Sequence, residues 1–529
     1  MIRDRFLADP EGIFVHDVIL SACRRFPSKT AIVDTSCLEA PLRITYAQYA
    51  DLITRLARGF VAAGISPGDV VGIFLANSWE FVAAYHASTL AGATPTMLNP
   101  SYREREVRYQ LENSGARILI SDGSLVRGMN LGGLPALQAV YTTRTDGCIG
   151  DLPFNHLLKP QTAPLPKHDR HPREVIAALP YSSGTTGLPK GVMLSHHNLV
   201  SNCYQTYGPG ASPSNEDQRV LVYLPLYHIY GLNVLMNPYL MIGATVVLMP
   251  RFIPETALQL WVDERITTSP SVPPVLNAYC QLAEKGLFPQ NHQVTWIKSG
   301  AAPLAPELAR RFTELTGIKI RHGYGMTEAS PVTHLGYTDP PEWYRPEWIG
   351  QPLYATECRV VAFDGDHERD AAVNEPGELV MRGPQFMLGY WNNPQATADV
   401  MRDGWYWSGD VVIRDDQGFY RVVDRRKEMI KYKGFPVAPA EVESVLMEHP
   451  AVRDCGVVGR PDAEAGEVPC AFIVLRDDVL ESNRTRDEIV AFVAERVAHY
   501  KVPHDIRFVQ AIPRNPSGKI LRRELRAAS

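Results

Sequence analysis

The stretch VVGIFLANSWEFVAAYHASTLAG, residues 70–92, predicts the fold class of this chain. Its first part, residues 70–76, is an apolar run without polar alternation, which predicts a strand buried on both faces. Residues 79–90 then have the composition of a helix, and Gly92 is expected to end it. A doubly buried strand followed at once by a helix is typical of a parallel α/β sheet.

The same alternation continues on both sides of this stretch. Thr45 and Gln48 form a capping box before a helix that is expected to end at Gly64. A further helix is predicted over residues 104–112 and a strand over residues 117–121. Helices and strands that alternate in this way place the chain in the α/β class.

The last hundred residues have a core pattern of their own. A helix is expected to begin at residues 439–441, and strands are expected at residues 455–458 and 471–475. Thr485 with Glu488 forms a second capping box before another helix. These elements predict a small α+β domain.

A charge-rich segment, residues 421–433, separates this small domain from the rest of the chain. Polar segments of this kind commonly join domains that move relative to each other. We therefore expect a hinge at Lys427, with a large N-terminal domain at residues 1–426 and a small mobile domain at residues 427–529.

Composition excludes several classes of protein. The chain has 529 residues, of which 45% are hydrophobic and 21% are charged, and its formal net charge is −5. These values are typical of a globular protein with several packed units, and they give no reason to expect a nucleic-acid partner. Eight scattered cysteines without zinc-ligand spacing indicate reduced, mostly buried thiols, and no secretory signal begins the sequence. Together these features predict a cytoplasmic protein.

One long uncharged segment, residues 220–250, needs a separate interpretation because its length is sufficient to span a bilayer. Prolines, glycines and asparagines interrupt it. They favour a buried strand, a turn and a helix over a continuous membrane helix.

Residues 181–191 read Tyr-Ser-Ser-Gly-Thr-Thr-Gly-Leu-Pro-Lys-Gly and form the strongest local signal. Hydroxyl groups, glycines and a cation in one loop are the combination that surrounds a triphosphate. The spacing is not that of a Walker A loop. Taken alone, such a cluster is also compatible with a solvated turn. The candidate phosphate ligands are Ser182, Ser183, Gly184, Thr185, Thr186 and Lys190.

Six further segments follow in order: LPLYHIYG at 224–231, KSGAAPL at 298–304, GYGMTE at 323–328, YWSGD at 406–410, VDRRKEMIKYKG at 423–434 and PRNPSGK at 513–519. Together with the phosphate loop, these motifs resemble, in their residues and in their order, those of the adenylate-forming (ANL) superfamily of acyl-CoA synthetases, nonribosomal adenylation domains and luciferases. The residues of these motifs are most similar to those of 4-coumarate-CoA-ligase-like enzymes. The resemblance covers nearly the whole chain, and it implies parallel α/β sheets plus a β-rich subdomain, followed by a mobile α+β domain.

The resemblance also implies roles at the nucleotide. Tyr324 would stack on adenine, Asp410 and Arg425 would hold the ribose, and Thr327 would contact the α-phosphate. Glu328 would hold Mg²⁺, a cation that favours oxygen ligands. The small residues that would let the backbone approach the base and the acyl group are Gly300, Ala301, Ala302 and Gly325.

Further implied roles concern the acid and the thiol. Lys519 would relieve the repulsion between carboxylate and phosphate, and His228 would lie at the mouth of the acyl pocket. The pocket wall would consist of Tyr230, Val234, Pro331 and Val332. Residues of the hinge segment would approach the adenylate or the pantetheine arm, namely Lys431, Lys433 and Gly434.

Simpler interpretations stay open for several of these residues. Asp410 could be an ordinary turn residue, and Glu328 could be an acidic residue in the first turn of a helix. His228 could be a core histidine, and the hinge segment could be a charged linker face. One position departs from the family wording: Pro436 stands where many relatives carry a polar residue, so that contact must be absent or replaced.

The function implied is an ATP-dependent acid–CoA ligase that uses ATP, Mg²⁺ and coenzyme A and acts on an aryl or medium-chain acid. Three alternatives share its first step or its ligands: an adenylation enzyme that loads a carrier protein or an amine, a luciferase-like oxygenase, and a non-catalytic nucleotide or acyl binder. The sequence specifies neither the acid nor the choice between monomer and homodimer.

Overall fold

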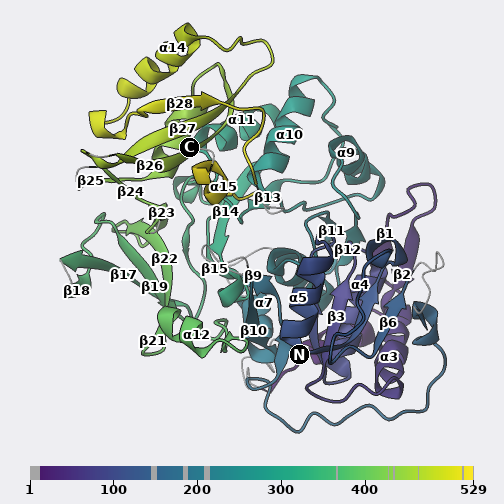
Figure 1. Ribbon diagram of the computed structural model, residues 1–529. Coiled ribbons are helices and arrows are strands. Elements are labelled where there is room, and N and C mark those ends of the chain that lie inside the picture. The colour runs from purple at the N-terminus through teal and green to yellow at the C-terminus, as the bar shows by residue number, and fades with distance from the viewer. Residues whose placement is uncertain are drawn as a thin grey trace.

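The computed structural model describes residues 12–143, 152–182, 189–207, 215–364, 367–426, 428–432, 435–462, 464–514 and 518–527. Figure 1 shows a large N-terminal part in purple and teal, a strand-rich region in green, and a small C-terminal part in yellow. The fold class is the α/β class predicted from the sequence, with parallel sheets, a β-rich subdomain and a small C-terminal domain.

The first sheet has the order β4-β3-β5-β6-β7, and all of its strands are parallel. Helix α4 packs against β3 and β4, and α3 packs on α4. The strands are Thr94–Met97 (β4), Val70–Phe74 (β3), Ala116–Ser121 (β5), Ala139–Thr142 (β6) and Leu152–Pro153 (β7); the helices are Tyr46–Ala62 (α3), Trp79–Leu90 (α4), Glu104–Ser114 (α5) and Gly123–Val126 (α6).

Predictions for this region are confirmed. Every residue of β3 is buried, as its unbroken apolar run requires. Thr45 caps α3 and exchanges hydrogen bonds with Gln48. Helix α5 ends at Gly115, which takes the left-handed conformation that favours glycine.

The second sheet has the order β11-β12-β1-β2, in which only β2 runs antiparallel to its neighbour. Its strands are Arg219–Val222 (β11), Thr245–Leu248 (β12), Thr30–Asp34 (β1) and Leu42–Thr45 (β2). Helices around it are Val15–Arg25 (α2), His196–Tyr207 (α7), Asn237–Ile242 (α8) and Pro254–Asp263 (α9).

The uncharged segment 220–250 contributes β11, β12 and α8 to this unit, together with a π-helical stretch, Gly231–Met236 (η2). No helix among the described residues is long and apolar enough to cross a membrane. The broken strand–turn–helix interpretation of the segment is therefore confirmed.

Two smaller sheets lie beside the first two. One has the order β20-β10-β8 with β9 attached to β10, and the other has the order β13-β14-β15-β16. Their strands are Gly389–Tyr390 (β20), Lys190–Ser195 (β10), Ile176–Ala178 (β8), Tyr181–Ser182 (β9), Trp296–Ser299 (β13), Lys319–Gly325 (β14), Val332–Leu335 (β15) and Gln351–Pro352 (β16). The accompanying helices are Pro273–Glu284 (α10) and Pro306–Thr316 (α11), with short 3₁₀ turns at Phe154–His156 (η1), Thr327–Ala329 (η3) and Pro341–Trp343 (η4).

The β-rich subdomain is an antiparallel sheet with the order β18-β17-β19-β22-β21, in which β23 also pairs with β22. Its strands are His367–Asp370 (β18), Glu357–Asp364 (β17), Gly377–Arg382 (β19), Trp405–Arg414 (β22), Met401–Arg402 (β21) and Tyr420–Arg425 (β23), and Pro394–Val400 forms α12. It leads directly into the C-terminal part (Figure 1).

The C-terminal part is a sheet with the order β25-β24-β27-β26 and β28 on β27. Its elements are Ile430–Tyr432 (β24), Phe435–Val437 (β25), Val452–Asp462 (β26), Gly466–Leu475 (β27), Asp505–Phe508 (β28), Pro439–Met447 (α13), Asn483–Ala494 (α14), His499–Lys501 (η5) and Arg522–Ala527 (α15). Its buried apolar side chains form two clusters that contain no residue before Ile430.

One capping prediction in this part was wrong. Ser482, not Thr485, is the N-cap of α14, and its side chain accepts a hydrogen bond from the backbone N–H of Thr485. The helix therefore begins three residues earlier than expected, because serine in extended conformation can satisfy the first free N–H groups. The predicted hinge residue, Lys427, lies outside the described residues.

Candidate active site

The two ends of the phosphate loop are held together by strand pairing. β9 and β10 are antiparallel, and Ser182 lies opposite Lys190 while Tyr181 lies opposite Gly191. The loop residues Ser183, Gly184, Thr185 and Thr186 lie outside the described residues. The hairpin brings Ser182 and Lys190, eight positions apart in the sequence, to the same point of the site.

Glu328 lies beside this hairpin. Its carboxylate is buried and accepts hydrogen bonds from the hydroxyl of Tyr390, at 2.8 Å, and from Oγ of Ser182, at 3.4 Å. The Nζ of Lys190 lies 5.1 Å from the centroid of the Tyr390 ring. Tyr390 therefore connects the phosphate loop to the candidate metal ligand, a role that its sequence position gave no signal of.

The residues around Glu328 fit a magnesium ion that is shared with phosphate groups. The described residues include no group of three or more His, Cys, Asp or Glu side chains that could hold a metal. Mg²⁺ is commonly bound through one or two carboxylates together with substrate phosphates and water, so the single carboxylate of Glu328 is a suitable protein ligand.

Replacing Tyr390 by phenylalanine is expected to raise the KM for MgATP by about tenfold. Hydrogen bonds to charged groups contribute about 1.5–3 kcal/mol, and this one fixes the carboxylate of Glu328. Steady-state kinetics of pyrophosphate release measure the effect. The matched control is Tyr354→Phe, because the Tyr354 side chain is exposed; equal KM values in both variants would exclude the role.

Asp410 and Arg425 face each other across a strand pair. They are directly opposite in the β22–β23 register, and Nε of Arg425 lies 3.0 Å from Oδ1 of Asp410. The hydroxyl of Tyr324 donates to Oδ2 of the same carboxylate at 2.5 Å. Burial and then the Asp410 charge raise the pKa of Tyr324, and Asp410 also raises the pKa of Arg425. The expected adenine-binding residue, Tyr324, is thus hydrogen-bonded to Asp410, one of the two expected ribose-binding residues.

Two of the small residues expected near the ligand, Gly300 and Gly325, lie close to other backbone segments of the protein. A Cβ on Gly300 would lie 3.2 Å from the carbonyl oxygen of Gly323, and one on Gly325 would lie 2.0 Å from that of Pro331. Ala301 has a φ of 66°, in the left-handed region, and Ala302 follows it. Glycine is therefore required at position 325, where a Cβ would collide with the backbone of Pro331, and position 300 is nearly as tight.

His228 and Thr327 line a common small pocket. Tyr181, which precedes Ser182, also lines it. The Nδ1 of His228 accepts a hydrogen bond from the backbone N–H of Tyr230 at 3.1 Å. Burial lowers the pKa of His228 to about 4, so the imidazole is neutral at pH 7 and its Nε2 can carry a proton.

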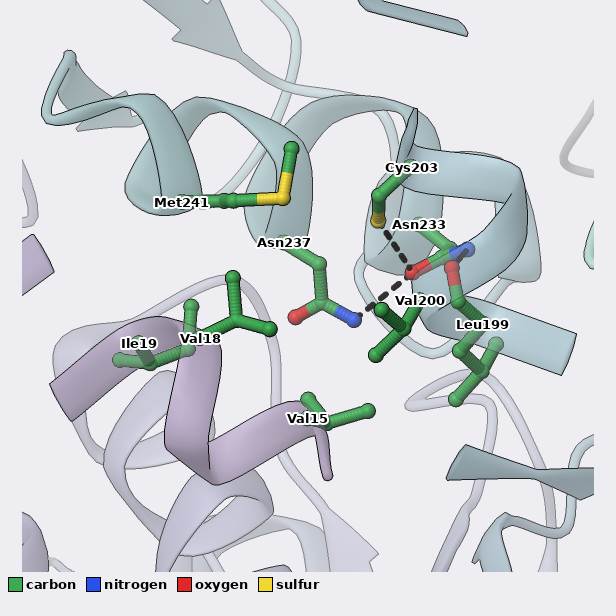
Figure 2. A pocket seen from close by; sticks show the side chains of 9 residues that line it. All are labelled: Val15, Val18, Ile19, Leu199, Val200, Cys203, Asn233, Asn237 and Met241. Atoms are coloured by element: carbon green, nitrogen blue, oxygen red, sulfur yellow. Dashed lines mark hydrogen bonds between the residues drawn. The ribbon is translucent and has the colours of Figure 1, made fainter. Parts of the chain in front are cut away.

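The expected acyl wall includes residues of the π-helical stretch η2. Asn233 fixes this stretch: its Nδ2 donates to the carbonyl oxygens of Leu199 and Ser330, at 3.1 and 2.7 Å. Figure 2 shows its Oδ1 accepting hydrogen bonds from Cys203 and Asn237 beside a small apolar pocket that α2 borders. Val234 follows Asn233 in the sequence, and Pro331 and Val332 follow Ser330. The hydrogen bond from Asn233 to Ser330 therefore links the two segments that form the expected wall.

Lys519 is partly buried, at a distance at which the charges of Asp410 and Arg425 act on it. Burial lowers the pKa of Lys519 to about 8; the charge of Arg425 lowers it further, while Glu428 and Asp410 oppose the shift. The neighbouring Gly518 approaches Pro274 of α10, whose side chain would be 3.1 Å from an added Cβ. The C-terminal domain thus presents its candidate catalytic lysine to the N-terminal part.

A pH effect follows from this pKa. Lys519 is protonated below about pH 8 and loses its charge as the pH rises through that value. Because kcat/KM reports the free enzyme, kcat/KM for ATP in adenylate formation is expected to fall about tenfold per pH unit above pH 8. In Lys519→Arg this fall should be missing, since arginine keeps its charge; an identical fall in both proteins would assign it to another group.

A buried ion cluster holds the segment that follows Lys519. Arg522 donates to both carboxylate oxygens of Glu443 at 2.7 Å and to Glu428 at 2.8 Å. Its Nε also donates to the backbone oxygen of Val457 at 3.1 Å. Arg522 was missed in the sequence, although its position three residues after Lys519 is a signal that could have drawn attention to it.

The remaining predicted residues belong to the C-terminal domain. Lys431 is exposed in β24, its backbone N–H donates to Glu467 at 2.9 Å, and it lies opposite Pro436 in β25. The structure thus places Lys431 on the C-terminal sheet, where it forms no ion pair with Asp410 within the described residues. Lys433 and Gly434 lie outside those residues.

The site can be compared with known proteins. The sequence profile of the AMP-binding enzyme family matches residues 20–391, and that of the AMP-binding enzyme C-terminal domain matches residues 441–519. 4-coumarate-CoA ligase 1 of Narcissus pseudonarcissus is 36% identical over 98% of this chain and 94% of its own length.

Two solved structures share the whole architecture. The anthranilate CoA ligase AuaEII in complex with anthranoyl-AMP has a TM-score of 0.87 and 27% identity, covering 98% of this chain and 97% of its own. The o-succinylbenzoate coenzyme A synthetase of Bacillus subtilis, in complex with ATP and a magnesium ion, has a TM-score of 0.79 and 29% identity, covering 96% and 98%.

Proposed function

Since the chain belongs to the AMP-binding enzyme family and is an AMP-forming acid–thiol ligase, we propose that it activates an aryl or medium-chain carboxylic acid with ATP and transfers the acyl group to the thiol of coenzyme A. The relatives named above include ligases of aromatic acids, which supports the aryl class. ATP and Mg²⁺ are bound by a relative of the same fold.

The first step joins the acid to AMP and releases pyrophosphate. A carboxylate oxygen attacks the α-phosphorus of ATP, the bond to the β-phosphate oxygen breaks, and pyrophosphate leaves with that electron pair. Asp410 and Tyr324 hold the nucleoside, and Ser182 and Lys190 bind phosphate oxygens. Mg²⁺, held through Glu328, would supply charge neutralisation at the phosphates.

Lys519 lowers the repulsion between the substrate carboxylate and the α-phosphate of ATP. At 4 Å and an effective dielectric constant of 20, each pair of unit charges repels by about 4 kcal/mol, and a cation between them offsets this repulsion. The proposal is supported above all by Lys519: the charges of Asp410 and Arg425 act on it, and the neighbouring Gly518 packs close to Pro274 of the N-terminal part.

The second step needs a different arrangement. The thiolate sulfur attacks the acyl carbon, a thioester bond forms, and AMP leaves with its oxygen; dividing the reaction in this way replaces one difficult step by two easier ones. We propose that the C-terminal domain, residues 427–529, rotates about Lys427 between the steps. This motion removes Lys519 and presents Lys431, Lys433 and Gly434 to the adenylate.

The acceptor and the location complete the proposal. Pro436 has no side-chain donor, so a polar contact at this position cannot contribute to either step. Coenzyme A is favoured over a carrier protein or an amine by the coenzyme A ligases among the relatives. A cytoplasmic location agrees with the free, mostly buried cysteines of the described residues.

Pyrophosphate release with ATP, Mg²⁺ and panels of aryl and aliphatic acids tests this function. We expect release that depends on the acid, and a thioester product only when coenzyme A is added. Acyl transfer to a carrier-protein thiol or to an amine, with no thioester formed when coenzyme A is added, would instead favour the carrier-protein or amine alternative. Absence of release with every acid would favour a non-catalytic binder.

A further inference from the structure

The two residues on either side of position 427 are fixed to different parts of the protein. Arg426 donates from its guanidinium to the carboxylate of Glu378, on β19 of the β-rich subdomain, at 2.8 Å. Glu428 instead accepts a hydrogen bond from Arg522, on α15 of the C-terminal domain, at 2.8 Å. The proposed rotation about Lys427 would therefore move the C-terminal domain relative to β23, the strand that ends just before it.

Strand β23 makes contacts on two opposite sides. Asp424 and Arg425 are consecutive, so their side chains point to different faces of the sheet. Arg425 forms the ion pair with Asp410 at 3.0 Å. Asp424 is 5% exposed, and its Oδ2 accepts a hydrogen bond from the backbone N–H of Ala440 at 2.9 Å. Because Ala440 belongs to α13, the strand contacts the nucleotide cluster with one residue and the C-terminal domain with the residue before it (Figure 1).

Asp424 supplies an acceptor that α13 lacks in its own sequence. The residue at the N-cap is Ala438, which has no side chain able to accept a hydrogen bond. Pro439 has no N–H, so Ala440 is the first residue of the helix with an N–H to donate, and Asp424 accepts it. A carboxylate at this end is also favoured by the helix dipole. The helix therefore takes its N-terminal acceptor from β23 and would lose it if the domain rotated.

Groups of the C-terminal domain largely set the environment of the Asp424 carboxylate. Burial raises the pKa of Asp424, and the charge of Glu428 acts in the same direction. The charge of Arg522 and the backbone N–H groups of Ala440 and Arg425 lower this pKa. Of these groups, all but the N–H of Arg425 lie after the hinge. The contact is thus a buried, charge-assisted connection between the two parts, a stronger kind of hydrogen bond than one between neutral groups.

The same orientation of the C-terminal domain brings Lys519 near the nucleotide cluster. Lys519 lies three residues before Arg522, whose charge acts on Asp424. The charges of Asp410 and Arg425 act on Lys519. Docking of α13 on Asp424 and presentation of Lys519 therefore occur in one arrangement of the domain.

We propose that Asp424 is a positioning residue that holds the C-terminal domain in the adenylate-forming arrangement by accepting the hydrogen bond from Ala440 at the start of α13. This proposal rests on the ligase function and on the rotation about Lys427. Asp424 touches neither acid nor nucleotide in this role and acts through Lys519. Its loss shifts the balance toward the other arrangement, so the first step should weaken while the second does not.

The two half-reactions of Asp424→Ala test the proposal under single turnover. Adenylate formation is followed as pyrophosphate release from ATP and the acid that the wild type activates fastest. Thioester formation is followed from the supplied adenylate of that acid and coenzyme A. We expect the first rate to fall about tenfold, as for loss of a hydrogen bond to a charged group. The second rate should stay unchanged or rise by up to about threefold, since the rotated arrangement is then more populated.

Three further variants separate positioning from general damage. Asp424→Asn keeps an oxygen that can accept from Ala440, so its adenylate formation should stay within about threefold of the wild type. Asp416→Ala changes an exposed carboxylate in the turn between β22 and β23 and should alter neither step. In a Lys519→Met background, Asp424→Ala should slow adenylate formation by less than about twofold more, because the group that it positions is already absent.

Three results would overturn the proposal. They are an equal loss of both half-reactions in Asp424→Ala, a loss in Asp424→Asn as large as in Asp424→Ala, and a full further loss in the Lys519→Met background. Each would indicate that Asp424 supports the fold rather than the arrangement of the domains.

Hydrogen exchange of the wild-type protein tests the same contact if Asp424→Ala does not fold. The peptide that contains Ala440 should exchange more slowly with the acid and a non-hydrolysable ATP analogue than with an acyl-adenylate mimic and coenzyme A. Equal exchange in both states would contradict the proposal. Failure of the ligase function would appear separately, as absence of pyrophosphate release by the wild type with the broad acid panel.

Discussion

Replacing Lys519 by methionine is expected to slow adenylate formation by about 10²- to 10³-fold. The ammonium lies in the field of Asp410 and Arg425 and is the cation that the C-terminal domain presents to the nucleotide cluster. Removing one positioned stabilising group of this kind commonly costs that much, and relief of a repulsion of about 4 kcal/mol accounts for it. Acid-dependent pyrophosphate release under single turnover measures the rate.

The matched control for this variant is Lys501→Met. Lys501 belongs to the same domain, but its ammonium is bound to the carboxylate of Glu441. We expect adenylate formation to stay within about threefold of the wild type in this control. An equal loss in both variants would indicate that any change of lysine in the small domain disturbs the reaction.

Arg522→Met is expected to lower the free energy of unfolding of the C-terminal domain by about 3–5 kcal/mol, the usual effect of removing one partner from a buried ion pair. The change leaves the carboxylates of Glu428 and Glu443 buried without their guanidinium. Because Arg522 fixes the start of α15, just after Lys519, adenylate formation should also fall, through loss of positioning. Urea unfolding and pyrophosphate release measure the two effects.

Two further variants separate these effects. Arg523 is exposed on the same helix, so Arg523→Met should change neither stability nor rate. Combining Arg522→Met with Glu428→Gln and Glu443→Gln should recover much of the lost stability, because the uncompensated carboxylates are then neutral. Unchanged stability in Arg522→Met alone would show that the ion cluster contributes nothing to the fold.

Local signals predicted much of the fold. The unbroken apolar run of β3, the Thr45 cap and Gly115 each act within a few residues, so they can be recognised without knowledge of the tertiary structure. The N-cap of α14 shows the limit of such signals. Both Ser482 and Thr485 can cap a helix, and residue type alone does not choose between them; in the structure Ser482 is the N-cap.

The candidate site was predictable only where its residues lie in recognisable segments. Asp410 and Glu328 lie in such segments. Only the structure shows that Arg425 lies opposite Asp410 in the strand pair and that the hydroxyl of Tyr390 donates to Glu328. Tyr390 comes from β20, far from the phosphate loop in sequence, and only the β10–β20 pairing brings it there.

The buried pair Lys298 and Arg321 was equally invisible in the sequence. Lys298 begins the recognisable segment KSGAAPL, but its burial and its register with Arg321 depend on β14. Lysine side chains are seldom fully buried, so residue type alone does not predict the burial of Lys298. Facing positions of parallel strands cannot be read from one segment.

A single preparation of Lys519→Met, assayed in both half-reactions, tests the central claim most directly. The measurement is the rate of adenylate formation from acid and ATP, divided by the rate of thioester formation from supplied acyl-adenylate and coenzyme A, relative to the wild type. The account predicts that this ratio falls by at least about 10²-fold, because the second step proceeds with Lys519 withdrawn. An unchanged ratio, with both rates lowered equally or neither lowered, would contradict it.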